Sequence, residues 1–164
     1  MADAAMRNER VAFLDITPGE ATPTYTLMGE GFTEVNDSLN PNVTEKTYIH
    51  ESTATKRVAS YAPEWAFNAD VIKDSDIIEF LRDIGKAQKT GVDCETTMVI
   101  FDMWEAINGE VPAYRYAVTV ALDNIGNGAG GEELTMSGNL LGIGDPVSGI
   151  FNTSDDTFVE GLIS

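Results

Sequence analysis

AYRYAVTVALD, at residues 113–123, is the stretch that decides the fold class, because apolar side chains recur in it at every second position. Its predicted buried face consists of Tyr114, Tyr116, Val118, Val120 and Leu122. The alternate positions carry small, polar or charged side chains. A period of two predicts a β-strand with one buried face and one wet face, as in antiparallel sheets.

Neighbouring segments have the same period. LTMSGNL at residues 134–140 and EWAFNADV at residues 64–71 also alternate, whereas residues 96–104 are apolar on both faces. A strand of the latter kind is expected to be covered on both sides. Shorter strands are expected at residues 11–16, 25–28, 32–35 and 157–159. The second and third of these flank Gly29-Glu30-Gly31 and are predicted to pair as a hairpin.

One helix is predicted, at about residues 75–89. Its apolar stripe, spaced i, i+3, i+4 and i+7, consists of Ile77, Phe80, Leu81 and Ile84. Side-chain oxygens at residues 74–76 are available to cap the first turn, and Gly91 suits a left-handed residue that stops the helix.

The predicted fold class is therefore β-rich α+β: an antiparallel β-sandwich or barrel with one packed helix. A chain of 164 residues suits a single domain over residues 1–164, with an N-terminal arm at 1–10 and a C-terminal tail at 160–164. Residues 36–62 differ from the rest, because they are polar and have few apolar anchors. Two exposed strands of a long hairpin are expected there, near 44–49 and 55–60. Such a projection buries little by itself and needs a partner.

Charge is distributed unevenly along the chain. Residues 1–90 carry fifteen acids and nine bases, whereas residues 91–164 carry twelve acids and one base, Arg115, in a total of −17. This balance argues against a protein that grips nucleic-acid phosphates, which needs clustered Lys and Arg. No segment has the apolar length of a membrane span, and the first ten residues lack the apolar core of a signal peptide. Cys94 is the single cysteine, which suits a reducing cytoplasm.

Candidate catalytic, metal-binding and cofactor-binding residues occur in this sequence only as isolated positions or incomplete motifs. GNGAGG at residues 126–131 contains the letters of a dinucleotide-binding loop, but two glutamates and a strand-like segment follow it, so a hairpin loop is expected. A calcium loop starting at Asp123 lacks its ligands, because Ile125 and Leu134 stand at the required positions. His50 is the only histidine, and the acids beside Cys94 disfavour a thiolate. We expect no enzyme activity, no metal and no cofactor.

A set of short segments follows in a characteristic order over about residues 40–160: NP at 40–41, KTYI at 46–49, ES at 51–52, SYAP at 60–63, FNAD at 67–70, DIGK at 83–86, KTG at 89–91, TTMVI at 96–100, MSGNL at 136–140, GDPV at 144–147 and GIFNT at 149–153. In this order the segments resemble the major tail tube proteins of long-tailed bacteriophages, particularly phages of Gram-positive bacteria.

The resemblance implies a structural virion protein that forms six-fold rings, stacked into the tail tube through which the genome is ejected. Implied partners are further copies of the chain, a tape-measure protein and DNA transiently in the channel, and tail terminator and tail tip proteins at the ends. Assembly in the host cytoplasm is expected. A long hairpin bridges neighbouring rings in this family. The candidate bridging residues are Asn40, Pro41, Lys46, Tyr48, Ile49, Lys56 and Arg57.

A DNA conduit should not bind DNA, since basic groups in the channel would hold phosphates. The wet faces of the later strands are small, neutral or acidic and are the predicted channel wall. The candidate channel-facing residues are Arg115, Thr119, Asp123, Thr135, Ser137 and Asn139. Arg115 fits this hypothesis poorly, because it is basic. Ordinary solvent-exposed faces of a β-sandwich would show the same pattern.

Two further functions stay open on the sequence. The tube of a contractile tail or of a phage-derived bacteriocin would have the same sequence features, since a fold does not fix its use. A free-standing β-sandwich binding module would also explain the strands and wet faces, but not the ordered similarity.

Overall fold

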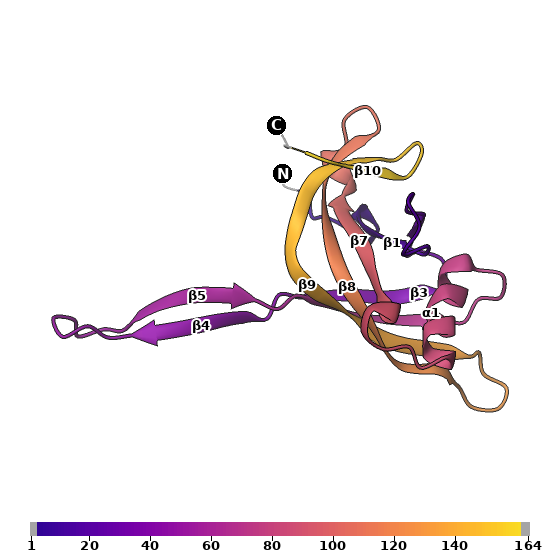
Figure 1. The fold of residues 1–164 in the computed structure, drawn as a ribbon, viewed down its shortest axis with the longest axis horizontal. Coiled ribbons are helices and arrows are strands. Elements are labelled where there is room, and N and C mark those ends of the chain that lie inside the picture. Colours follow the sequence, from indigo (N-terminus) through magenta and orange to yellow (C-terminus); the bar gives the residue numbers. More distant parts are fainter. Residues whose placement is uncertain (1–2, 162–164) are drawn as a thin grey trace.

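The computed structural model describes residues 3–161, and an eight-stranded antiparallel sheet forms its body (Figure 1). The strands are β1 (Arg10–Asp15), β2 (Tyr25–Leu27), β3 (Phe32–Ser38), β6 (Glu64–Asp70), β7 (Glu95–Asp102), β8 (Glu110–Asn127), β9 (Thr135–Asn152) and β10 (Thr157–Glu160). Their order is β2-β1-β7-β8-β9-β6-β3, and β10 pairs with β9. A separate hairpin consists of β4 (Pro41–Lys46) and β5 (Thr55–Tyr61). The predicted β-rich α+β fold class is confirmed.

The longest elements are β8 and β9, of 18 residues each, which pair with each other along most of their length. The period of two predicted the central part of β8 and only the beginning of β9. The second half of β9 was missed, because Gly142, Gly144, Pro146 and Gly149 interrupt the alternation there. Residues 128–134 connect the two strands, so the glycine-rich segment lies in a hairpin turn, as predicted. Leu134, predicted as part of the buried face, lies in that connection and is 43% exposed.

The buried face of the sheet changes along its strands: one face packs against a core at one end, and the opposite face packs against a second core at the other end. Leu14, Phe67, Met98, Val118 and Leu140 belong to a core beneath the helix. A second core contains Phe13, Val99, Phe101, Val111, Ala113 and Phe151, in the part of the sheet where β10 pairs with β9. Within the second core, the Phe151 ring lies 4.6 Å from Phe13 and 4.9 Å from Phe101. Strand β7 contributes alternate residues to both cores, which confirms the prediction that it is covered on both sides.

This exchange of faces corrects the predicted burial of β8. Val118 and Val120 are buried beneath the helix, as expected, with Tyr116 and Leu122 packed against the same core. At the start of the strand the opposite face is buried instead, because it meets the phenylalanines of the second core. Ala113 is therefore fully buried, whereas Tyr114 is 48% exposed.

The described residues contain one α-helix, α1 (Asp76–Lys86), and three short 3₁₀ segments, Arg7–Glu9, Gly91–Cys94 and Met103–Glu105. Ile77, Leu81 and Ile84 of the predicted stripe are buried, and Phe80 packs against the core. The helix ends three residues earlier than predicted, because Gln88 has a φ of 52° and breaks the helical path. Gly91 also has a positive φ, but it begins the following 3₁₀ segment.

The first turn of α1 does not have the predicted cap. Ser75 has the extended backbone of an N-cap residue, but its side chain makes no capping hydrogen bond. Asp76 and Glu79 lie in the first turn and Lys86 in the last, which suits the helix dipole. Charge placement and burial of the apolar stripe therefore stabilise this helix without a side-chain cap.

Two expectations about the strands are wrong: one concerns the pairing of β2 with β3, and the other concerns the end of β7. Strands β2 and β3 do not form a hairpin: β2 pairs with β1, and β3 pairs with β6 at the other edge of the sheet. Residues 28–31 connect these two edges, so the sheet is curled enough for four residues to pass from one edge to the other. Met103 and Trp104, predicted to continue β7, lie in the 3₁₀ segment after it, where they are 40% and 55% exposed.

Candidate assembly surfaces

The β4–β5 hairpin projects away from the sheet (Figure 1). Its two strands overlap the segments expected to form an exposed hairpin. Strand β4 begins and ends three residues before the expected 44–49, and β5 ends one residue after the expected 55–60. Nearly every residue in it is exposed. At its base, Ala62 N–H donates to Leu39 O at 3.0 Å, and Asn40 Nδ2 donates to Ala62 O at 3.1 Å. The hairpin makes few contacts with the rest of its own chain, so its side chains are available to a partner.

The two faces of the hairpin differ chemically. Thr44 is opposite Arg57, and Lys46 is opposite Thr55, and these four side chains line a shallow hollow together with Tyr48. On the other face Val43 is opposite Val58, and Glu45 is opposite Lys56. One face therefore presents two cations, and the other presents an apolar pair and a pair of opposite charges.

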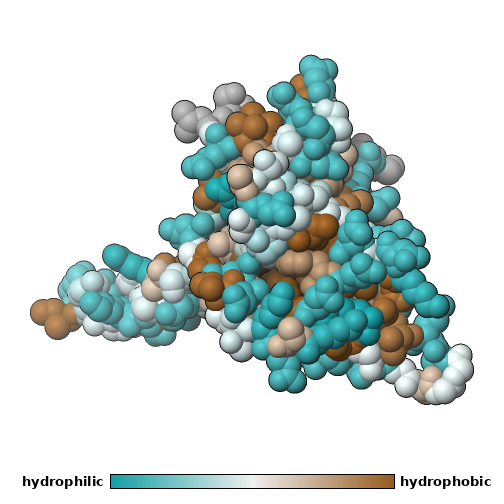
Figure 2. Space-filling model, turned by 45° about the vertical axis from the view of Figure 1, so that its right-hand side comes forward, coloured by the Kyte–Doolittle hydropathy of each residue, from teal (hydrophilic) through white to brown (hydrophobic). Residues whose placement is uncertain are grey.

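The candidate bridging residues occupy distinct parts of this element. Asn40 and Pro41 lie at its base. Tyr48 and Ile49 lie in the connecting loop at its far end, where Figure 2 shows hydrophobic atoms beyond a mostly hydrophilic stem. Ile49 is fully exposed, at 107% of its reference area.

The wet face of the sheet forms one continuous surface across five strands. Thr119 of β8 is opposite Glu95 of β7 and Leu141 of β9. Asn139 is opposite both Ala121 and Ala66. We call this surface the sheet wall. Its residues are Glu95, Thr97, Ala117, Thr119, Ala121, Asn124, Thr135, Ser137, Asn139, Leu141, Glu64, Ala66, Asn68, Asp70, Glu34, Asn36 and Ser38.

The structure brings four predicted channel-facing residues together on the sheet wall: Thr119, Thr135, Ser137 and Asn139. Asp123 lies in a bulge, because Leu122 is opposite Gly138 while Asn124 is already opposite Ser137. Asn124 takes the place expected for Asp123, and its Nδ2 donates to Ser137 Oγ at 2.8 Å. The sequence does not signal this bulge.

Strands β6 and β3 extend the sheet wall with residues that the sequence analysis did not propose. Asn68 Nδ2 donates to Glu34 Oε2 at 3.0 Å, and Asn36 Nδ2 donates to the same oxygen at 3.4 Å. The polar positions of the alternating segment at 64–71 are the signal that would have included Asn68. The wall contains acids, amides and hydroxyls, and its residues include no Lys or Arg.

The side chain of Arg115, the remaining candidate channel-facing residue, contacts β10. Its guanidinium is 5.2 Å from the centre of the Phe158 ring, and Nη2 is 3.5 Å from Glu160 Oε2. Strand β10 thus supplies both an aromatic face and a carboxylate to Arg115. The basic residue that fitted the channel hypothesis poorly has its charge offset by its own chain.

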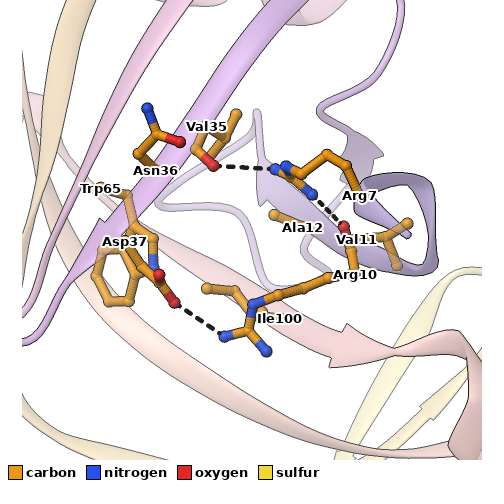
Figure 3. Close-up of a pocket in the computed structure, with 9 residues that line it drawn as sticks. All are labelled: Arg7, Arg10, Val11, Ala12, Val35, Asn36, Asp37, Trp65 and Ile100. Atoms are coloured by element: carbon orange, nitrogen blue, oxygen red, sulfur yellow. Dashed lines mark hydrogen bonds and ion pairs between the residues drawn. The ribbon is translucent and has the colours of Figure 1, made fainter. Parts of the chain in front are cut away.

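The arginines before and in β1 are also engaged (Figure 3). Arg10 lies 3.2 Å from Asp37 and 3.0 Å from Asp102. Arg7 donates to Val35 O at 3.0 Å and to Arg10 O at 2.6 Å, which ties the segment before β1 to β3. Arg7, Arg10 and Asp37 border a hollow of about 220 Å³. Residues 1–2 of the expected arm and 162–164 of the expected tail lie outside the described residues.

Burial raises the pKa of the Tyr116 hydroxyl, and the nearby Arg10 cation acts in the opposite direction. The Tyr116 ring packs edge-on against Trp65, with ring centres 4.7 Å apart.

The described residues do not form a cluster suited to hold a metal ion. Between residues 3 and 161, no group of three His, Cys, Asp or Glu side chains is arranged to hold a metal ion. Cys94 is buried, and His50 is exposed, 3.8 Å from Glu51. Within the same range, α1 is too short and too polar to cross a membrane.

Comparison with solved structures identifies the kind of particle in which this fold occurs. One similar chain comes from the virion of a native gene transfer agent particle, with 12% identity and a TM-score of 0.59. Another comes from the tail of the empty gene transfer agent particle, determined with C6 symmetry, with 14% identity and a TM-score of 0.57. Each alignment covers 87% of this chain and 97% of the other. The chain has a phage-tail-like fold.

A third similar chain extends the range of particles. It comes from the six-fold symmetrised baseplate of the anti-feeding prophage, with 10% identity, a TM-score of 0.53, and coverage of 90% of this chain and 97% of that one. No family model matches the chain, and no curated protein matches it in sequence. The likeness is therefore one of fold, and it is found in chains of almost the same extent.

Proposed function

We propose that this protein is a structural component of a phage tail, which polymerises as stacked hexameric rings into the tail tube. The observation that carries the proposal is a fold shared with chains of six-fold symmetric tail and baseplate particles, over nearly their full length. A projecting hairpin with few contacts to its own body agrees with it, because a subunit of a continuous polymer needs exposed surfaces for its neighbours.

In this proposal the β4–β5 hairpin bridges one ring to the next. The candidate bridging residues remain those proposed from the sequence: Asn40, Pro41, Lys46, Tyr48, Ile49, Lys56 and Arg57. At about 3.3 Å per residue, the nine residue-to-residue steps from Asn40 to Ile49 reach about 30 Å, which is enough to cross into a neighbouring subunit.

The sheet wall is the proposed lining of the channel. Thr119, Ser137 and Asn139 give it short neutral side chains, and Glu34 and Glu64 add negative charge at its β3 and β6 side. Such a surface repels phosphates and offers them no cation to bind. The genome and a tape-measure protein would pass along it transiently, and terminator and tip proteins would close the two ends.

Negative-stain microscopy of the purified protein at increasing concentration tests this function. Hollow tubes, or single rings with six-fold averages, are the expected result. A protein that stays monomeric at millimolar concentration, or that forms assemblies without six-fold symmetry, would contradict the proposal.

The tube of a contractile tail or of a phage-derived bacteriocin is a second candidate. The likeness to a chain of the anti-feeding prophage baseplate is the observation that favours it. Both candidates share the ring-forming role. A sheath protein encoded beside this chain would favour the contractile version.

A further inference from the structure

The loop of the β4–β5 hairpin presents an apolar side chain that its own chain leaves uncovered. Glu51 N–H donates to Tyr48 O at 3.0 Å, which closes a turn with Ile49 near its apex. Ile49 is fully exposed, and Tyr48 is 46% exposed. Lys46, the last residue of β4, lies just before this loop on the hairpin face that also carries Arg57. The far end of the hairpin is therefore an apolar tip with cations behind it.

A second apolar surface, bordered by acids instead of cations, lies at the turn between β7 and β8. Trp104 and Ile107 are 55% and 72% exposed there. Ile107, Pro112 and Ile150 line a hollow of about 380 Å³, and Glu105 and Glu110 line the same hollow. We call this apolar hollow with its two carboxylates the turn surface.

The turn surface is held rigidly. Asn108 and Gly109 both have positive φ, 53° and 80°, as in the tight turns that suit a twisted hairpin. Ile107 and Glu110 exchange backbone hydrogen bonds of 2.8 and 3.0 Å. Thr153 donates to Gly109 O from its backbone N–H at 2.9 Å and from its hydroxyl at 3.0 Å. A pre-formed surface loses little conformational entropy when a partner docks.

Charge favours contact between these two surfaces. Residues 39–62 carry three bases and two acids, whereas the rest of the chain carries seven bases and twenty-five acids. Outside the hairpin, two copies of the chain carry the same net negative charge and therefore repel each other at close range. The net positive charge of the hairpin offsets this repulsion. An apolar tip backed by Lys46 matches an apolar hollow bordered by carboxylates.

We propose that the hairpin tip of one copy docks into the turn surface of a second copy, with Ile49 in the hollow and Lys46 facing Glu105 and Glu110. The two surfaces lie at different ends of the molecule and point in different directions (Figure 1), so one chain does not satisfy both. Contact between unlike surfaces is heterologous and continues from copy to copy, as a stacked polymer requires. The inference rests on the proposed tube function and names its contact.

Cross-linking tests the contact without requiring tubes. A mixture of the Ile49→Cys and Ile107→Cys proteins is oxidised, and the mixed disulfide dimer is identified by mass spectrometry. The matched control replaces Ile107→Cys by Val92→Cys, which is 78% exposed and lies before the other end of β7. Wild type, whose single Cys94 is buried, gives the background. A mixed dimer formed at least five times more with position 107 than with position 92 is expected, and equal or no cross-linking overturns the proposal.

Charge exchange tests the same contact in the assembled state. Lys46→Glu is expected to reduce polymer yield at low salt at least tenfold, and adding Glu105→Lys with Glu110→Lys is expected to restore it. Lys89→Glu makes the same charge change at an exposed position after α1 and should leave the yield within twofold of wild type. Equal loss from Lys46→Glu and Lys89→Glu overturns the docking. Wild-type tubes without the 49–107 cross-link refute this contact alone, whereas a cross-link without tubes refutes the tube function alone.

Discussion

At the scale of single residues, Gly149 of β9 lies directly opposite Glu160 of β10. A Cβ at Gly149 would collide with Val159 O and the Phe158 ring. Gly149→Ala is therefore expected to displace β10 and destabilise the fold by about 1–3 kcal/mol, as in other overpacked sites. Thermal unfolding followed by circular dichroism should show a midpoint lowered by roughly 3–10 °C.

Gly130→Ala is the matched control for that measurement. An added Cβ at Gly130 meets no atom within 4 Å, and its φ is not in the left-handed region. The control should unfold within about 1 °C of wild type. A Gly149→Ala protein as stable as this control would show that β10 does not pack closely on β9.

Tyr116 gives a prediction about pH. Burial raises its pKa above the ordinary 10.0 of tyrosine, so the unfolded chain loses this proton at a lower pH than the folded chain does. The contribution of Tyr116 to stability is complete below pH 10 and falls as the pH rises above it. Between pH 9 and 11, the melting temperature of Tyr116→Phe should fall less steeply than that of wild type.

Tyr61→Phe serves as the control for Tyr116, because it removes the hydroxyl of an exposed tyrosine that is not among the groups acting on Tyr116. Its melting temperature should follow the wild-type pH profile. If both variants have the same profile, the burial of Tyr116 does not govern the alkaline loss of stability.

At the scale of elements, the hairpin is expected to be dispensable for folding and necessary for assembly. Pro41 and Tyr61 are cross-strand partners, so an Asn-Gly turn in place of residues 42–60 closes the strands without strain. We expect a folded protein with a melting temperature within a few degrees of wild type, since the exposed hairpin buries little. Size-exclusion chromatography with light scattering should show monomers or isolated rings, and normal tube growth would refute the bridging role.

The sequence predicted elements best where burial follows a single period. The centre of β8, the beginning of β9, all of β6 and the stripe of α1 were predicted because each has one apolar face against one core. The start of β8 was wrong at Ala113 and Tyr114, since the second core covers the opposite face there. Local periodicity does not report where a sheet changes its buried side.

Pairing and loop geometry were less predictable. The connection between β2 and β3 is short enough for a hairpin, but the curled sheet places its two strands on opposite edges. The bulge that moves Asp123 off the sheet wall and brings Asn124 onto it also depends on register with β9. Asn108-Gly109, by contrast, is a strong hairpin signal in the sequence that was overlooked, and it lies at the turn surface.

At the scale of the whole molecule, the distribution of charge gives a prediction about DNA. Tubes assembled from wild type in the presence of short duplex DNA should retain none of it at 50 mM salt, because the sheet wall has no Lys or Arg. Thr119→Lys with Asn139→Lys places two cations per subunit on the wall and should make the tubes retain DNA in a sedimentation assay. Retention should fall steeply as salt is raised.

The control for DNA retention is Glu79→Lys with Asp83→Lys, which makes at least as large a charge change on exposed positions of α1. These tubes should retain less DNA than those with a basic sheet wall. Retention of DNA by wild-type tubes would argue against a channel lined by this face.

A cryo-EM reconstruction of the polymer tests the central claim most directly. It is expected to show stacked rings of six subunits around an open channel, with Thr119, Ser137 and Asn139 facing the channel and α1 away from it. A polymer without six-fold rings, or one whose channel is lined by α1, would contradict the account.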